Sequence, residues 1–201
     1  MYNYYERTYY TLDDIRKAIG GSYITSEGPY AMSSKSLSEF LNDCLEKAGL
    51  ALRTYTIETN EGTTCFRDFI WPRFYLETIV YTDSDENDEL LQKFAKTKVG
   101  QIFAWWTSST EKYSLLIQNL ENNKTKLLDD VKSASISRFN DTPQNSGDFS
   151  DDQHTSTVTK TENSSNVGTM MARLNEIEDN IKQLYMDWSD EFRKFIIWSV
   201  N

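Results

Sequence analysis

The feature that most constrains this chain is the polar stretch "RFNDTPQNSGDFSDDQHTSTVTKTENSSN", residues 138–166. Phe139, Phe149 and Val158 are its only large apolar residues. Ordering such a stretch costs about 1–2 kcal/mol per residue in backbone entropy, and its own side chains cannot offset that cost by burial. A structureless connection of this length is rare inside a compact domain. We therefore expect an extended arm that is held by partners outside its own domain.

Two long helical patterns flank this arm. The first runs from about Thr110 to Ser133, and the second continues to the end of the chain. Apolar residues of the second pattern recur every three or four positions, close to a heptad repeat. They are Met170, Leu174, Ile177, Ile181, Leu184, Trp188, Phe192 and Phe195. The pattern predicts a helical hairpin whose connection projects away from it.

Two arrangements can cover the apolar stripe of the last helix. The two long helices can pack on each other, which is the usual role of such a stripe. Near the end, however, Phe192, Phe195, Ile196, Ile197 and Trp198 crowd several sides of the helix, and one partner helix rarely covers such a surface. We therefore favour burial in a neighbouring subunit. The expected contact residues are Leu174, Ile177, Ile181, Leu184, Trp188, Phe192 and Phe195.

Shorter helices are predicted in the first half of the chain. Thr11 with Asp14, and Ser36 with Glu39, have the spacing of capping boxes. Glycines follow both helices, as is typical of helix ends. The second helix places Cys44 on its apolar face, so we expect this cysteine in the core.

A small β element is predicted between residues 50 and 82. "LRTYTIET", "TTCFRDFIW" and "RFYLETIVYT" are rich in β-branched and aromatic residues, and "NEG" is a hairpin signal. The third segment is equally compatible with a helix. A loop is expected around Gly28 and Pro29, and a capped helix from residue 84 is expected to end at Gly100.

These patterns together predict a mainly α fold, a helical bundle with long helices, a small β element and the extended arm. The expected organisation is a helical core domain at 1–137, with short strands around 50–82. The arm follows at 138–166, and the C-terminal amphipathic helix at 167–201.

Charge and composition exclude several function classes. The net charge of −10 and the lack of any basic run argue against general nucleic-acid binding, although an acidic surface can line a channel through which DNA slides. The N-terminus lacks the pattern of a signal peptide, and Pro72, Arg73 and Glu77 interrupt the longest apolar stretch. Cys44 and Cys65 fit no zinc spacing. We expect a soluble protein with two reduced thiols.

No motif predicts catalysis, a cofactor or a metal. His154 is the only histidine and lies in the polar arm, where nothing supplies the rigid second shell of a metal site. "DSDEND" from Asp83 fails the calcium-loop pattern, since Asp88 replaces the required glycine. Trp105 and Trp106 can form a stacking platform, but we favour one in the core and one at an interface.

The arm carries a pattern for partner binding. Thr155, Thr157, Thr159 and Thr161 alternate along one side of "TSTVTKT", which predicts a strand that adds to the edge of another sheet. The expected arm contacts are Phe139, Phe149, Thr155, Thr157, Val158, Thr159 and Thr161. The tyrosine-rich "MYNYYERTYY" at the N-terminus is expected to be a second contact element.

The segment "RFNDTPQNSGDFSDDQHTS", followed by "MMARLNEIEDNIKQLYMDWSDEFRKFI", resembles the C-terminal part of neck proteins of crAss-like tailed bacteriophages. The resemblance covers residues 138–197. It implies a ring protein of the head–tail connector, matching a twelvefold portal, assembled in the host cytoplasm and retained in the virion. It further implies contacts with the portal, with neighbouring neck or tail proteins and with DNA passing through the channel. Two alternatives are a tail or tail-knob component, and a host-directed binding protein whose arm folds on a partner.

Overall fold

The computed structural model describes the backbone of residues 7–20, 23–25, 28–32, 35–53, 58–83, 86–140 and 156–197, and their side chains except at 24–32, 130–140 and 156–167. The chain forms two compact units. Unit 1 comprises Met1–Leu115 and Leu184–Asn201, and unit 2 comprises Leu116–Gln183. The last residues of the chain thus complete the unit that its first residues begin. This division does not coincide with the expected boundary at residue 137.

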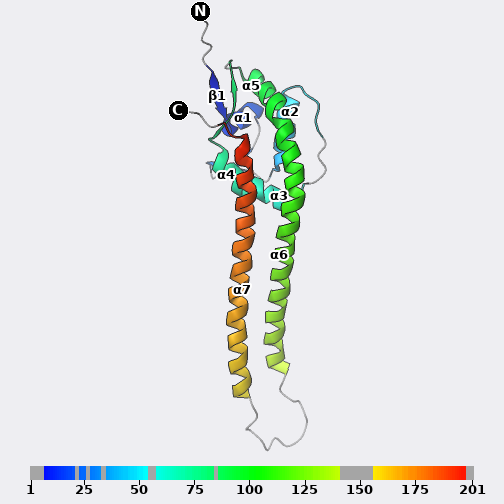
Figure 1. The fold of residues 1–201 in the computed structure, drawn as a ribbon, viewed down its shortest axis with the longest axis vertical. Coiled ribbons are helices and arrows are strands. Elements are labelled where there is room, and N and C mark those ends of the chain that lie inside the picture. Colours follow the sequence, from blue (N-terminus) through cyan, green and yellow to red (C-terminus); the bar gives the residue numbers. More distant parts are fainter. Residues whose placement is uncertain are drawn as a thin grey trace, which may run out of the picture. The chain divides into compact units, whose positions relative to one another are not determined.

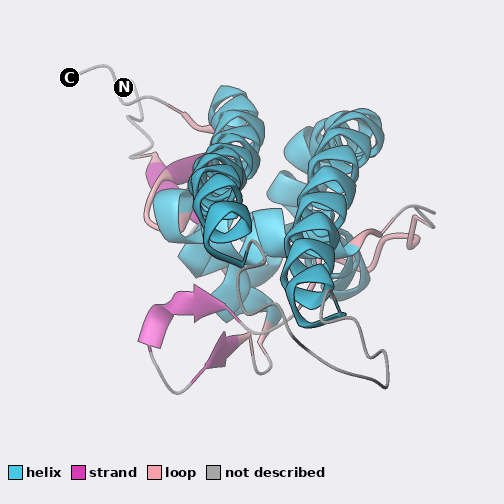
Figure 2. Ribbon diagram, turned by 90° about the horizontal axis from the view of Figure 1, so that it is seen from below, coloured by secondary structure: helices cyan, strands magenta, loops and turns pink. Residues whose placement is uncertain are grey.

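The fold is mainly helical, as expected, with two small pairs of strands (Figures 1 and 2). In chain order the elements are β1 (Thr8–Thr11), α1 (Leu12–Ile19), β2 (Ile24–Thr25), β3 (Gly28–Met32), α2 (Leu37–Lys47), α3 (Asn60–Thr64), the π-helix η1 (Cys65–Ile70), α4 (Trp71–Phe74), β4 (Thr78–Thr82), α5 (Asn87–Phe94), the π-helix η2 (Ala95–Val99), α6 (Gly100–Asn140), α7 (Ser156–Glu191) and the 3-10 helix η3 (Phe192–Phe195).

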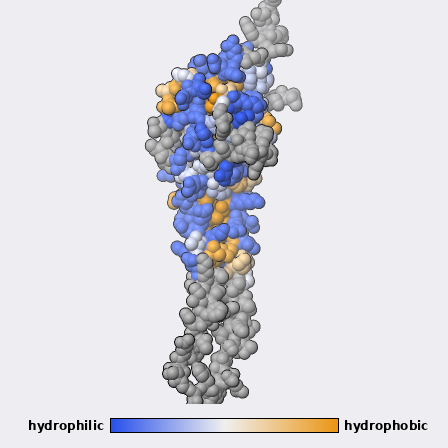
Figure 3. All heavy atoms as spheres, turned by 180° about the vertical axis from the view of Figure 1, so that it is seen from behind, coloured by the Kyte–Doolittle hydropathy of each residue, from blue (hydrophilic) through white to orange (hydrophobic). Residues whose placement is uncertain are grey.

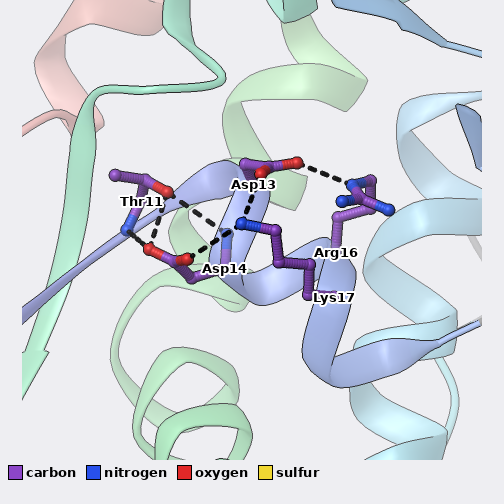
Figure 4. Close-up of polar contacts among 5 residues, drawn as sticks. All are labelled: Thr11, Asp13, Asp14, Arg16 and Lys17. Atoms are coloured by element: carbon purple, nitrogen blue, oxygen red, sulfur yellow. Dashed lines mark hydrogen bonds and ion pairs between the residues drawn. The ribbon is translucent and has the colours of Figure 1, made fainter. Parts of the chain in front are cut away.

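The predicted caps of α1 and α2 are confirmed. Thr11 Oγ1 accepts from the backbone N–H of Asp14, and the carboxylate of Asp14 accepts in return from the backbone N–H of Thr11 (Figure 4). In the same turn the buried Asp13 lies 2.7 Å from Arg16 Nε and 2.8 Å from Lys17 Nζ (Figure 4). The two capping bonds satisfy the backbone N–H groups of Thr11 and Asp14 at the start of the helix. Gly20 ends α1 with a φ of 76°.

The small β element is built differently from the prediction. β1 pairs with β4 antiparallel, with Thr8 opposite Thr82 and Tyr10 opposite Val80. The N-terminal tyrosines Tyr9 and Tyr10 therefore belong to an intramolecular strand, and residues 1–6 lie outside the described part. β2 and β3 form a second antiparallel pair where a loop was expected around Gly28 and Pro29.

The predicted strand at "TTCFRDFIW" and its hairpin turn are wrong. Thr59 Oγ1 accepts from the backbone N–H of Gly62 at 2.9 Å, so "NEG" is the first turn of α3 and not a hairpin. Residues Cys65–Ile70 form the π-helix η1. A helix brings Phe66 and Ile70, four positions apart, to the same side, and both are fully buried there. The segment "RFYLETIVYT", for which both a strand and a helix were predicted, begins in helix α4 and ends in strand β4. Residues 54–57 of the first segment lie outside the described part.

Gly100 does not end a helix, contrary to the prediction. Its φ of −62° and ψ of −37° are helical, and α5, η2 and α6 follow one another without a break. Ile102, Phe103 and Trp106 are buried at helical spacing directly after it, and this packing outweighs the weak helix propensity of glycine.

Aromatic side chains fill the core of unit 1. Phe40 lies against Tyr23, Phe66 and Trp71, with ring centroids about 6 Å apart. Cys44 is fully buried in this core, as predicted, and burial raises the pKa of its thiol.

Candidate interaction surfaces

The C-terminal segment is fastened into unit 1 by Trp188. Its side chain is fully buried and stacks between Trp106 and Tyr113, with centroid distances of 5.0 and 5.2 Å. The Trp188 Nε1–H donates to Ser109 Oγ at 3.0 Å. The indole is therefore packed between aromatic rings, and its N–H group has a hydrogen-bond partner. Contacts within the single chain thus fix the position of Trp188.

Glu191 adds a polar clamp at the same place. Its carboxylate accepts from Trp105 Nε1–H and from Tyr113 Oη–H, both at 2.8 Å. Burial by itself would raise the pKa of Glu191, but the two hydrogen bonds, together with Lys112 and Lys194, lower it overall. Burial and the hydrogen bond to Glu191 raise the pKa of Tyr113. Glu191 is therefore held as a carboxylate at neutral pH.

Arg73 fastens the last turn of α7 from α4. Its guanidinium donates to Ser189 Oγ, to the carboxylate of Asp190 and to the carbonyl oxygen of Met186. A cation near the C-terminal end of a helix is favourable because the helix dipole is negative there. Beyond α7, the backbone N–H of Ile197 donates to the Thr78 carbonyl of β4 at 2.7 Å.

These contacts correct the prediction that the end of the last helix is buried in a neighbouring subunit. Trp188 is fully buried, and Phe192 and Phe195 are 1 % and 5 % exposed within the chain itself. Phe192 packs on Phe74 and Trp105, which are not in the last helix. Trp105 is also buried, so the expected division of Trp105 and Trp106 between core and interface is wrong.

The other residues of the expected contact lie nearer the middle of α7. Leu174 is buried, whereas Ile177, Ile181 and Leu184 are half-buried. Within the chain, the stripe is therefore fully covered at Leu174 and only partly covered between Ile177 and Leu184.

The predicted arm strand is wrong where the structure describes it. Thr157, Val158, Thr159 and Thr161 lie in α7, which begins at Ser156. A helix satisfies its backbone hydrogen bonds internally, and extending one by a turn costs little even with threonine, whereas a lone strand needs a partner. Phe139 lies in α6, and its side chain is outside the described part. Phe149 and Thr155 lie outside the described residues altogether.

The helical segments of unit 2 that belong to α6 and α7 run antiparallel (Figure 1). Side chains of both helices line a groove. The groove has a volume of about 370 Å³. Its lining residues, which we call the groove face, are Glu121, Lys124, Thr125, Leu128, Glu178 and Ile181. Lys124 Nζ lies 2.6 Å from Glu178 Oε1 and joins the two helices across it. Leu128, one of the lining residues, is 38 % exposed.

The opposite side of unit 2 is more apolar. The buried Ile117 and Leu174 mark the side of each helix that faces the other helix. At about 100° per residue, Leu120 and Glu121 lie on opposite sides of the direction of Ile117, and Ile177 and Glu178 lie on opposite sides of the direction of Leu174. Since both glutamates belong to the groove face, Leu120 and Ile177 belong to the other. The residues of this leucine face are Leu116, Leu120, Asn123, Leu127, Arg173, Ile177 and Asn180.

Apolar side chains on the leucine face are incompletely covered. Leu116 is 42 % exposed, and Leu120, Leu127 and Ile177 are half-buried. On the side of the molecule behind the view of Figure 1, apolar side chains likewise lie along the two long helices between hydrophilic flanks (Figure 3). Ile177 and Ile181, which the sequence predicts as contact residues, belong to the leucine face and the groove face respectively. The α6 residues of the two faces were not predicted as contacts, although their apolar pattern is visible in the sequence. Leu116, Leu120 and Leu127 form one line along the helix, and Leu128 lies on another.

Among the residues that the structure describes, no three His, Cys, Asp or Glu side chains are grouped as metal ligands. No helix in the described part of the chain is long and apolar enough to cross a membrane. His154 lies outside the described residues. The arrangement in unit 2 offers two long contact faces, which are suited to packing against another helix.

Comparison of the chain with protein-family models, with curated proteins and with solved structures finds no match.

Proposed function

We propose that this protein is a structural component of a tailed-bacteriophage virion and forms a ring in the neck, between portal and tail. The ring has twelve copies, in register with the portal, and is assembled in the host cytoplasm. The resemblance of residues 138–197 to neck proteins of crAss-like phages supports the proposal. It assigns a scaffolding role without a catalytic centre or cofactor.

The observation that carries the proposal is the exposure of apolar side chains on both faces of unit 2. Among its described apolar residues only Ile117 and Leu174 are buried, while Leu116, Leu128 and Met171 are 38–49 % exposed. Two helices packed only on each other leave such side chains in water, at a cost of about 25 cal/mol per Å² of apolar surface. Neighbouring copies in a ring would cover them.

The charge of the chain supports a place around a DNA channel. At a net charge of −10 the protein repels DNA, so DNA can pass without specific binding.

Native mass spectrometry of the full chain, alone and mixed with the portal protein, tests the proposal. We expect a species of about twelve copies, either alone or on the portal, and the protein in purified virions. A monomer that ignores the portal and is absent from virions would overturn the proposal and favour a host-directed role. A protein found in virions but indifferent to the portal would move it to the tail.

A further inference from the structure

We propose that the ring contact is made between the unit 2 hairpins, with the leucine face of each copy packed on the groove face of the next. The inference rests on the self-association in the proposed function. It specifies which face of one copy meets which face of the next. The occupant of each groove is a second copy of this chain.

The two faces differ in charge. On the groove face the Lys124–Glu178 ion pair is neutral as a pair, which leaves Glu121 as the charge in excess. The leucine face holds no acidic residue at its seven described positions, and Arg173 is its only charge. Bringing the two faces together therefore sets opposite charges near each other around an apolar centre.

The alternative, in which like faces meet, is less favourable. Two groove faces would bring Glu121 of one copy towards Glu121 of the other, in a chain that already carries ten excess negative charges. Two leucine faces would leave both grooves, with Leu128, uncovered. Unlike faces cover both apolar surfaces at once, and such a head-to-tail contact repeats until a ring closes.

Two variants of the full chain test this polarity. Leu116→Glu adds an acid to the leucine face at an exposed position, opposite the acidic groove. Thr125→Arg places a large side chain in the groove. Because Thr125 is exposed, the hairpin itself should stay intact. Asn122→Glu is the matched control, because Asn122 is exposed on the same helix but belongs to neither face. Circular dichroism and unfolding curves identify variants that fold.

We expect each face variant alone to lose the ring, with at least a tenfold rise in the apparent dissociation constant, while Asn122→Glu assembles like the wild type. When the two face variants are mixed, each retains one intact face. We expect them to form a 1:1 dimer that grows no further, measured by native mass spectrometry or light scattering.

The outcomes separate the inference from the proposed function. If both face variants assemble like the wild type, the inference is overturned and the ring function stands on another contact. A mixture that stays monomeric while the control assembles overturns the pairing of unlike faces. If the predicted dimer forms but the wild type neither binds the portal nor occurs in virions, the contact is supported and the neck function fails.

Discussion

Glu191 is the residue where burial, hydrogen bonding and charge meet most closely. Its carboxylate accepts from the buried Trp105 and from Tyr113, so it ties the end of α7 to α6 within unit 1. Hydrogen bonds to charged groups are stronger than those between neutral ones. The polar clamp therefore supplements the apolar contact of Trp188.

Replacing Glu191 with Gln keeps the shape of the side chain and removes its charge. We expect Glu191→Gln to lower the free energy of unfolding by about 1–2 kcal/mol at pH 7. The pKa of Glu191 is lower when folded than the ordinary value of about 4.3, so its contribution is present above pH 4.3. It is lost as pH falls through the folded pKa.

Denaturant unfolding at pH 7 and at pH 3 measures this difference. We expect the gap between wild type and Glu191→Gln to shrink at the lower pH. Glu111→Gln, at an exposed position on α6, the helix that carries Trp105 and Tyr113, is the matched control and should show no gap at either pH. An equal gap at both values would mean that the carboxylate charge does not stabilise the clamp.

At the scale of elements, the packing around α3 determines whether Gly62 can be replaced by a larger residue. An added Cβ at Gly62 would lie 3.2 Å from Thr59 Oγ1 and 3.3 Å from Trp106 Cζ2. Thr59 Oγ1 is held by the cap of α3 and lies 2.7 Å from Ser114 Oγ, and Trp106 is buried between Trp105 and Trp188. Neither neighbour can move freely.

We therefore expect Gly62→Ala to destabilise the protein by about 1–3 kcal/mol, although alanine is the better helix former. Gly168→Ala is the matched comparison, because its Cβ would meet nothing within 4 Å in α7. That substitution should stabilise by about 0.5–1 kcal/mol. Thermal unfolding of both variants provides the measurement, and a stabilising Gly62→Ala would contradict the packing argument.

Local signals and non-local packing explain which elements could be predicted. The starts of α1 and α2 were predictable because Thr11 and Ser36 are capped by residues only three positions away. α3 was mistaken for a turn because the stretch around Gly62 carries the composition of a hairpin. The burial of Phe192 was visible as apolarity, but sequence does not show that its cover lies at Phe74 and Trp105. The two faces of unit 2 require knowledge of which helices are adjacent.

For the whole molecule, the discontinuity of unit 1 is the main consequence of the fold. Its core is closed by residues from the end of the chain, after the whole of unit 2 has been made. The stability of unit 1 therefore depends on the buried side chains of its C-terminal segment, among them Trp188 and Phe192.

A chain that ends at Gln183 tests this dependence. It lacks Trp188, Phe192 and Phe195, and loss of each large buried aromatic costs about 3–5 kcal/mol. The sum approaches or exceeds the 5–15 kcal/mol that stabilise a typical domain. We expect the truncated chain to lose its near-ultraviolet circular dichroism and its cooperative transition. A cooperative fold in this chain would show that the C-terminal segment is dispensable.

Removing unit 2 instead should spare unit 1. Replacing residues 120–181 with a short Gly-Ser linker keeps every contact of Trp188 and Glu191 described above, because their partners on α6 all precede residue 114. We expect a single cooperative transition whose midpoint shifts by less than about 5 °C, equivalent to roughly 1 kcal/mol. The same chain lacks the whole groove face and all of the leucine face except Leu116, so it should remain monomeric where the full chain forms a ring. If the shortened chain binds a hydrophobic dye and melts without cooperativity, unit 1 needs the hairpin in order to fold. If it folds and still forms a ring, the ring contact lies on unit 1.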